Sequence, residues 1–279
     1  MPLANVAKIL KDAQAGGYAV AAFNVFNLES ITWLVKAAEA EGSPVIAMLY
    51  PACNKHVPES TFTAIAIDLA RQAKVPVGVH YDHCGSFDQI MAAIAAGFSS
   101  VMIDGSALPY EENVAITTAI ARAAHPMGVT VEAELGLVGR ASNLDDFINT
   151  SRYTEPSAAA DFAARTGVDS LAVAIGSAHG NYVAEPKLDL SRLEEIRSMV
   201  ATPLVLHGGS GIPESQIREA VKRGITKLNI GTEFGQESWR QIEALVGGEK
   251  SPGSLLSALM RVEPAMVEYV RAKIRLLRP

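Results

Sequence analysis

The chain has 279 residues, 49% of them hydrophobic and 19% charged, and its 24 Lys and Arg against 30 Asp and Glu give a net charge of −6. This composition excludes a disordered, collagen-like or coiled-coil protein, because about half of the residues are available for a buried core. The acidic balance is unlike that of proteins that neutralise a phosphate backbone, so we expect no nucleic-acid partner. An anionic ligand must therefore be bound by local groups.

Neither the cysteines nor the N-terminus indicates export or a membrane. Cys53 and Cys84 are the two cysteines of a chain long enough to bury a large core without disulfides. Lys8, Lys11 and Asp12 interrupt the apolar positions near the N-terminus, so we expect no signal peptide there. No run approaches the roughly 18 apolar residues of a membrane span. We expect a reduced, cytoplasmic protein without a membrane partner.

Eight short apolar runs alternate with amphipathic helical patterns along the chain. The runs predict strands over residues 18–25, 45–50, 75–82, 100–104, 129–135, 170–176, 203–209 and 227–233. The helical patterns include residues 28–41, 59–72, 87–96 and 111–124. Alternation without hairpins indicates an all-parallel sheet, and eight such units predict an α/β fold that closes into a (β/α)₈ TIM barrel.

A doubly wound open sheet is the alternative architecture. It normally has a G-x-G-x-x-G turn after an early strand, whereas residues 22–26 read AFNVF. No Gly/Ser-rich linker or change of composition divides the chain. We therefore expect one TIM-barrel domain over residues 1–279, in which residues 251–279 form a C-terminal helical extension.

Polar side chains follow seven of the eight predicted strands, at the carboxyl ends where barrel enzymes place their chemistry. They are Asn24, Asp82 with His83, Asp104, Glu134, His179, His207 and Asn229. Three imidazoles, from His83, His179 and His207, with an open coordination position are typical of a catalytic zinc site. For any one histidine, a hydrogen bond that caps a strand end is the alternative role. Three of them beside a carboxylate favour the metal site.

Two residues near these are weaker candidates for a role in the metal site. His80 lies inside a predicted strand, either packed in the core or supporting a ligand from behind. Cys84 adjoins His83, but no second cysteine lies nearby in the sequence, so we expect a structural role for it.

Glycine-rich turns lie at the ends of the last two predicted strands. Residues 207–211 read HGGSG just before a helix start at Pro213, and residues 229–232 read NIGT. Exposed amides and a helix N-terminus favour an anion, and the loops after strands seven and eight are the usual phosphate site of this fold. A glycine cluster by itself is more often only a tight turn. The position of these two clusters is what predicts a phosphate site.

Six stretches of the chain, taken together, resemble the class II, zinc-dependent ketose-bisphosphate aldolases, and most closely the tagatose-bisphosphate aldolase branch. They are residues 22–24 (AFN), 79–83 (VHYDH), 101–106 (VMIDGS), 131–136 (VEAELG), 174–180 (AIGSAHG) and 205–211 (VLHGGSG). The resemblance implies that His83, His179 and His207 bind one catalytic zinc and that Asp82 is the acid/base at the cleaved bond. It also implies a site for the phosphate of dihydroxyacetone phosphate, with a monovalent cation nearby. The residues expected to bind substrate and phosphate are Asn24, Gly180, Gly208, Gly209, Ser210, Asn229, Ile230, Gly231 and Thr232.

Zinc-dependent aldol cleavage suits these residues on chemical grounds. Cleavage removes a hydroxyl proton and leaves an enediolate, which a zinc ion would stabilise as a Lewis acid. Asp82 would take the proton, and orienting His83 is its alternative role. Asp104 and Glu134 would form a second metal position or support the ligands. A Schiff-base route needs a lysine at the carboxyl end of a strand, whereas Lys227 opens the last predicted strand at the opposite end.

The chain departs from the resembled family in the half of the site that faces the aldehyde. Relatives carry a loop glutamate that exchanges the enediolate proton, and this chain has Ala141 there. Asp145 or Asp146 would substitute for it, or both are surface charges. Ser257 stands where relatives carry an arginine for the distal phosphate, and Tyr50 replaces a small hydroxyl residue.

The sequence thus predicts a class II aldolase, a carbon–carbon lyase acting on a small sugar phosphate. It would cleave a ketose 1-phosphate or 1,6-bisphosphate reversibly into dihydroxyacetone phosphate and an aldehyde that need not be phosphorylated. A fructose- or tagatose-1,6-bisphosphate aldolase proper, with Arg140, Lys55 or Arg261 as substitute cation, is the first alternative. A phosphate-binding barrel without turnover is the second. We also expect a homodimer or homotetramer.

Overall fold

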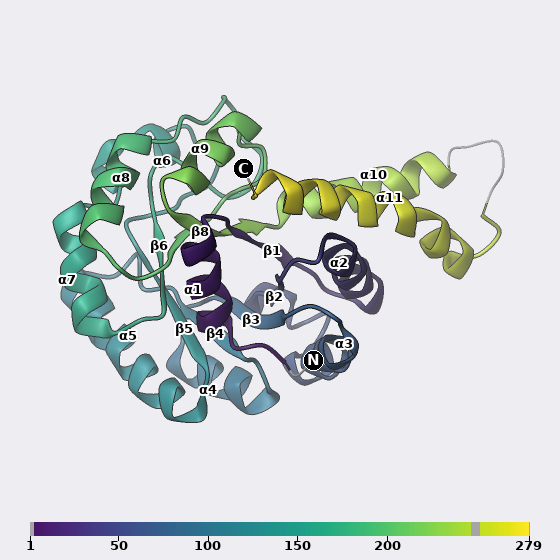
Figure 1. Ribbon diagram of the computed structural model, residues 1–279, viewed down its shortest axis with the longest axis horizontal. Helices are drawn as coiled ribbons and strands as arrows, with labels where there is room; N and C mark the ends of the chain where they lie inside the picture. Colours follow the sequence, from purple (N-terminus) through teal and green to yellow (C-terminus); the bar gives the residue numbers. More distant parts are fainter. Residues whose placement is uncertain (1–2, 247–251, 279) are drawn as a thin grey trace.

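The structure, a computed structural model, describes residues 3–246 and 252–278 (Figure 1). Eight parallel strands close into a barrel in chain order, and β8 pairs with β1. The strands are β1 (Val20–Asn24), β2 (Val45–Leu49), β3 (Val77–Cys84), β4 (Ser100–Ile103), β5 (Thr130–Leu135), β6 (Ser170–Val173), β7 (Leu204–Leu206) and β8 (Ile225–Ile230). The predicted (β/α)₈ barrel with a C-terminal helix is confirmed. The predicted domain and tail also include residues 1–2, 247–251 and 279, which lie outside the described part.

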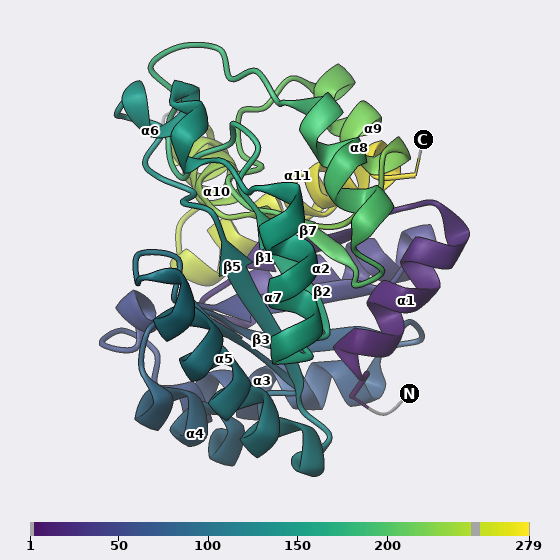
Figure 2. The same ribbon diagram turned by 90° about the vertical axis from the view of Figure 1, so that its left-hand side faces the viewer.

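Helices surround the barrel, as the view from its side shows (Figure 2). They are α1 (Val6–Gly16), α2 (Leu28–Glu41), α3 (Glu59–Gln72), α4 (Phe87–Ala96), α5 (Tyr110–Ala124), α6 (Asp145–Ile148), α7 (Pro156–Thr166), α8 (Leu190–Met199), α9 (Glu214–Lys222), α10 (Thr232–Val246) and α11 (Leu255–Leu276). Short 3₁₀ turns cover Pro51–Cys53, His125–Met127 and Thr150–Arg152. Local signals set several helix starts, as at α2, where the Asn27 side chain accepts the Ser30 N–H at 3.0 Å.

The predicted boundaries of the last strand were wrong. The predicted strand covered residues 227–233, but β8 ends at Ile230 and α10 begins at Thr232. The N–H of Glu233 donates to the Ser210 side chain at 3.1 Å, and a glutamate in a first helical turn is favoured by the helix dipole. Lys227 does not open the strand at the far end of the barrel. It is the third residue of β8 and is fully buried.

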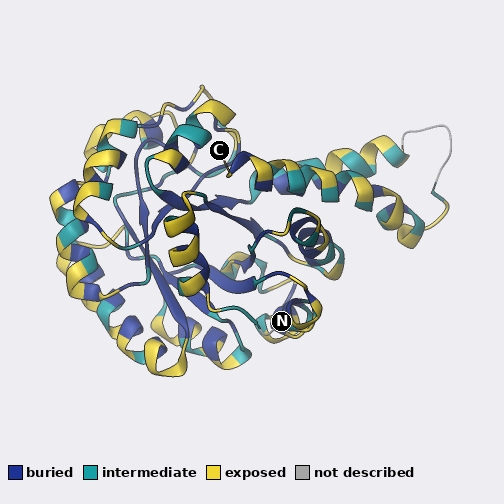
Figure 3. Ribbon diagram, in the orientation of Figure 1, coloured by how far each residue is buried: buried dark blue, intermediate teal, exposed yellow. Residues whose placement is uncertain are grey.

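The barrel interior changes from apolar to polar along its axis. At the N-terminal end, Ile9 and Leu10 of α1 pack against Val20 and Ile46 and close the barrel. Further along, the inward-facing side chains are polar and contact one another across the barrel: His80, Ser100, Glu132, Ser170 and Lys227. Outside the strands, a continuous apolar core joins them to the helices, so the strands are buried on both faces (Figure 3).

The last two helices form an arm that projects from the barrel (Figure 1). Phe234 anchors α10 by an edge-on contact with Phe23 of β1, with ring centroids 5.4 Å apart. Arg271 and Arg275 of α11 donate to Glu41 at the end of α2, at 2.7 and 2.8 Å. Within the described residues, no helix is both long enough and apolar enough to cross a bilayer.

Candidate active site

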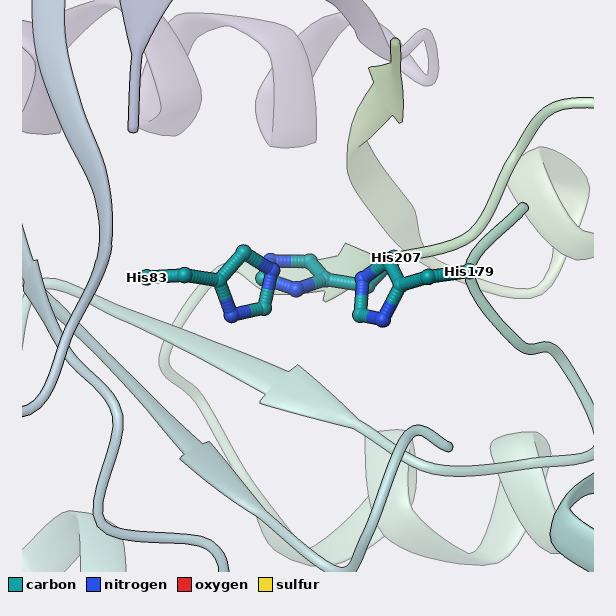
Figure 4. Close-up of side chains that lie close together, drawn as sticks. All are labelled: His83, His179 and His207. Atoms are coloured by element: carbon teal, nitrogen blue, oxygen red, sulfur yellow. The ribbon is translucent and has the colours of Figure 1, made fainter. Parts of the chain in front are cut away.

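Three histidine side chains meet at the carboxyl ends of the strands (Figure 4). His83 belongs to β3, His179 follows β6 and His207 follows β7. The ring centroid of His83 lies 4.7 Å from that of His179 and 4.5 Å from that of His207. One ring nitrogen from each histidine lies within 4.8 Å of the other two. The structure therefore brings together the three histidines that the sequence nominated as metal ligands.

His83 reaches this position through a strained backbone. Its φ is +47°, and it is the one residue other than glycine with a positive φ in the described ranges 3–246 and 252–278. The pairing of β3 with β4 also shifts register between Tyr81 and Cys84. Such a conformation costs about 1–3 kcal/mol and is found where the surrounding structure enforces it, often at functional sites.

The far nitrogens of two of these rings are held by carboxylates. Nδ1 of His83 lies 2.8 Å from Asp104, which also accepts from the Ser106 hydroxyl at 2.7 Å. Nε2 of His207 lies 3.1 Å from Glu132, a residue of β5. A carboxylate on one ring nitrogen fixes the tautomer and leaves the other nitrogen for a metal.

The remaining donor atoms fit a metal ion. Nε2 of His179, Nδ1 of His207 and Oε2 of Glu134 are buried and have no hydrogen-bond partner among the described residues. Buried polar atoms are nearly always satisfied, so a cluster of unsatisfied ones calls for an explanation. Three imidazoles with a nearby carboxylate form a donor set suited to zinc or a similar transition metal.

The charges around the rings agree with a cation site. Burial would lower the pKa of His207, but the hydrogen bond of Nε2 to Glu132 and the carboxylate of Glu134, 3.3 Å from Nδ1, outweigh burial and raise the pKa to about 10. Burial, together with the neighbouring His83 and His207, lowers the pKa of His179 to about 3. The pocket therefore stabilises positive charge beside the two glutamates, and a bound metal ion would supply that charge.

Asp82 lies beside the histidines with both carboxylate oxygens occupied. Oδ1 accepts the Asn229 amide at 3.1 Å, and Oδ2 accepts the Asn24 amide at 3.0 Å. Burial would raise the pKa of Asp82, but the positive charges of His83 and His207 outweigh it and lower the pKa to about 2. Asp82 is thus an ionised group in a fixed orientation at the base of a cavity.

The cavity, of about 1030 Å³, opens at the carboxyl ends of the strands. Most of the predicted substrate-binding residues line it: Asn24, Gly180, Gly208, Ser210, Asn229, Gly231 and Thr232. Gly209 and Ile230 do not. Gly209 packs against Leu228, and the side chain of Ile230 is buried.

The cavity lining includes a group of apolar and aromatic side chains, Phe26, Tyr50, Cys53 and Trp239. None of the described lining residues is a lysine or an arginine. A hydrogen bond with Cys53, aided by burial, raises the pKa of Tyr50 to about 12, so its phenol is neutral. To a substrate, the described lining therefore offers this aromatic surface but no lysine or arginine.

The loop after β5 is bound to the loop that carries His179. The Ala141 N–H donates to the His179 carbonyl at 2.8 Å, and the His179 N–H donates to the Gly139 carbonyl at the same distance. Ala141 itself is buried in a small cluster with Phe147, Ala178 and Tyr182. The position where relatives are expected to carry an acid therefore faces packed side chains.

Neither aspartate nominated as a substitute acid lines the cavity. Asp146 accepts the Arg140 N–H at 2.7 Å and a bond from Arg152 at 3.0 Å, so it caps the loop. Asp145 forms part of the same ion-pair cluster at the surface. Ser257 lies in the first turn of α11, where its N–H donates to the Ser254 side chain.

Sequence reasoning missed two residues of the site, Glu132 and Lys227. Both lie under His207 and are fully buried. A signal was present, because residues two apart on a strand face the same side. Glu132 shares the inward face of β5 with Glu134, and Lys227 shares that of β8 with Asn229.

Comparison with known proteins identifies the family. The model of fructose-bisphosphate aldolase class-II matches residues 4–279. The chain belongs to the class II fructose-bisphosphate aldolase family. The family-level resemblance to class II aldolases read from the motifs is confirmed, and this class II aldolase is a lyase that catalyses aldol cleavage.

Individual relatives match this chain over nearly its full length. A fructose-bisphosphate aldolase of Staphylococcus epidermidis is 38% identical over 282 residues, which cover 99% of this chain and 97% of that protein. The crystal structure of the YdjI aldolase of Escherichia coli K12 has a TM-score of 0.87 at 36% identity and covers 99% and 97% of the two chains. A fructose-bisphosphate aldolase of Campylobacter jejuni, at 24% identity and a TM-score of 0.80 over 98% and 93% of the chains, shares the fold.

Gly208 offers a test of how tightly the metal-site loops are packed. A Cβ at this residue would lie 2.3 Å from the Ala178 carbonyl oxygen, and its φ is +66°. We expect Gly208→Ala to destabilise the protein by more than Gly180→Ala. Gly180 has a φ of +103° but nothing within 4 Å of its added Cβ. That variant should therefore lose only the free energy of backbone strain, about 1–3 kcal/mol. Urea denaturation measures both, and equal losses would contradict the packing.

Proposed function

We propose that this class II aldolase uses a zinc ion on His83, His179 and His207 to cleave a ketose 1-phosphate reversibly. The products would be dihydroxyacetone phosphate and an aldehyde that need not be phosphorylated. The observation that carries the proposal is the convergence of three histidines, with buried unpartnered nitrogens, beside an ionised Asp82.

The metal would be held by the three imidazoles, with Glu134 beside them. When bound, a zinc ion supplies Lewis-acid stabilisation of the negative charge that develops as the carbon–carbon bond breaks. Asp104 orients His83 through its hydrogen bond and, with Glu134, flanks a second position for the ion. His83 belongs to two groups of residues that could hold a metal ion, one with His179 and His207 and the other with Asp104 and Glu134. This supports both assignments.

Asp82 would take the proton of the substrate hydroxyl. The amides of Asn24 and Asn229 hold its carboxylate at the base of the cavity, next to a metal ligand in the sequence. A proton acceptor must lie within hydrogen-bond reach of the reacting group, and this clamp keeps it in one orientation.

The donor phosphate would bind where three loops and a helix end meet. Gly180, Gly208, Ser210 and Gly231 line this side of the cavity, and α10 begins at Thr232. The positive end of a 15-residue helix is a ready site for phosphate. The monovalent cation and the role of Gly209 and Ile230 near this phosphate stay predictions.

The aldehyde half would bind against Phe26, Tyr50 and Trp239. A terminal phosphate is usually bound by arginine, whose planar donors match its oxygens. The described lining residues include no lysine or arginine, and Arg140 and Lys55 are exposed outside the cavity. The second candidate, a fructose-1,6-bisphosphate aldolase, is favoured by the name of the Staphylococcus epidermidis relative.

The arm supports a homo-oligomer, either a dimer or a tetramer. Its apolar side chains Trp239, Leu255, Leu256 and Met260 are all more than 60% exposed. Exposed apolar patches of this kind on a projecting element are typical of interfaces between subunits. We also propose that the chain forms a single domain and is located in the cytoplasm.

Removal of the metal tests the proposed chemistry. We expect a chelator to abolish cleavage and added zinc or cobalt to restore it, as measured by release of triose phosphate. His207→Ala should lose metal affinity, whereas His56→Ala, in an exposed loop, should retain it. Full activity of metal-free protein would refute the mechanism.

Asp82→Ala separates the proton acceptor from the metal site. We expect the variant to fold and to bind the metal but to cleave at least about 10²-fold more slowly, the range of general acid–base groups. Asp68→Ala, on the exposed side of α3, is the matched control. Near-normal turnover of Asp82→Ala would assign Asp82 a supporting role instead.

The acceptor proposal predicts the substrate preference. Because no lysine or arginine lines the cavity within the described part of the chain, we expect kcat/KM for ketose 1-phosphates to approach or exceed that for the matching 1,6-bisphosphates. A bisphosphate preference above about 10³, some 4 kcal/mol of transition-state binding, would favour the second candidate.

A further inference from the structure

We propose that Glu132, supported by Lys227, is a positioning residue that selects the nitrogen through which His207 binds the metal. Glu132 accepts the Nε2–H of His207, which leaves Nδ1 as the ligand atom. This inference rests on the proposed metal site. It adds a functional role for an ion pair buried in the barrel.

Glu132 is held by donors on three sides. Oε1 lies 3.1 Å from Nε2 of His207 and 2.8 Å from Nζ of Lys227, and Oε2 lies 2.9 Å from the same Nζ. The Ser170 hydroxyl donates to Oε2 at 3.0 Å. With its oxygens occupied in this way and no exposure to solvent, the carboxylate has little freedom to move.

His207 lies between two carboxylates that compete for its ring N–H. Glu132 approaches Nε2, and Oε2 of Glu134 lies 3.3 Å from Nδ1. A histidine that binds a metal is neutral and carries one N–H, so the proton on one nitrogen determines which nitrogen has a free lone pair. If Nδ1 carried the proton, it would face Glu134, and His207 would have no lone pair toward the other histidines.

The buried pair is poorly explained by stability alone. Barrel interiors are usually filled by branched apolar side chains. Replacing a buried ion pair by apolar residues of similar size is often neutral or even stabilising, because both charges must be removed from water. The pair lies directly below a predicted ligand and bonds to it, which points to a role in the metal site.

Two double variants separate the hydrogen-bond acceptor that Glu132 offers to His207 from the charges of the Glu132–Lys227 pair. Glu132→Gln with Lys227→Met removes both charges but keeps a side-chain oxygen that accepts the His207 N–H. Glu132→Met with Lys227→Met has the same length without an acceptor. Neither variant leaves an unpaired buried charge, and unfolding by urea verifies that both fold.

We expect zinc affinity, measured by competition with a chromophoric chelator, to be about 10–100-fold weaker in the methionine variant than in the glutamine variant. Lys273→Met removes the lysine of another ion pair, with Glu233 at the base of the arm, and should leave the affinity unchanged. Equal zinc affinities of the two double variants would overturn the positioning role.

A spectroscopic measurement tests the assignment directly. Long-range ¹H–¹⁵N correlation spectra of the zinc-loaded wild-type protein distinguish the protonated ring nitrogen from the metal-bound one. We expect His207 to be protonated at Nε2 and bound through Nδ1. Binding through Nε2 would overturn this inference while leaving the metal site intact, whereas a wild-type protein that binds no zinc would overturn both.

Discussion

Closure of the parallel sheet, by pairing of β8 with β1, is the constraint on which the rest of the molecule depends. Closure brings the carboxyl ends of all eight strands to one rim, so His83 from β3 meets His179 and His207 from the loops after β6 and β7. It also leaves the inward-facing residues no contact with solvent from the sides. Every polar group inside must therefore find a partner across the barrel.

The interior meets this requirement in layers. Apolar side chains and α1 seal the N-terminal end, and above them His80 and Lys227 pair with Ser100 and Glu132. In that layer Nε2 of His80 has no hydrogen-bond partner among the described residues, and in the uppermost layer, at the histidines and Glu134, several buried donors and acceptors lack one as well. The strained backbone of His83 lies in that same layer. A group of unsatisfied atoms and a strained backbone thus coincide in the layer where a metal ion would satisfy the unpartnered atoms.

Much of the fold follows from local signals in the sequence. The predicted helices 28–41, 59–72 and 87–96 coincide with α2, α3 and α4, whose starts are marked by Asn27, Pro58 and Ser86. The end of β8 could not be predicted from local signals, because the start of α10 depends on Ser210, more than 20 residues earlier. The burial of Lys227 likewise depends on Glu132, 95 residues away in the sequence.

The candidate site divides in the same way. The rule that chemistry lies at strand ends selected the histidines and Asp82, since it needs only strand order. The hydrogen bonds from Asn24 and Asn229 to Asp82, and the tie between Ala141 and His179, required the register of elements far apart in the chain. The apolar wall of the cavity also had no sequence signature, because its three aromatic residues come from separate segments.

Two parts of the cavity lining differ in composition, one being largely backbone and the other largely aromatic side chains. This difference determines which substitutions each part tolerates. The part proposed to bind phosphate consists largely of backbone, where a Cβ on Gly208 would clash with the loop of His179, so substitution there would disturb the proposed metal site. The aromatic part consists of the side chains of Phe26, Tyr50 and Trp239, none of which is a proposed metal ligand. Substitution in that part would therefore alter the proposed aldehyde site while the histidines and Asp82 keep their positions. A single aldol chemistry can in this way be combined with different acceptors on the same barrel.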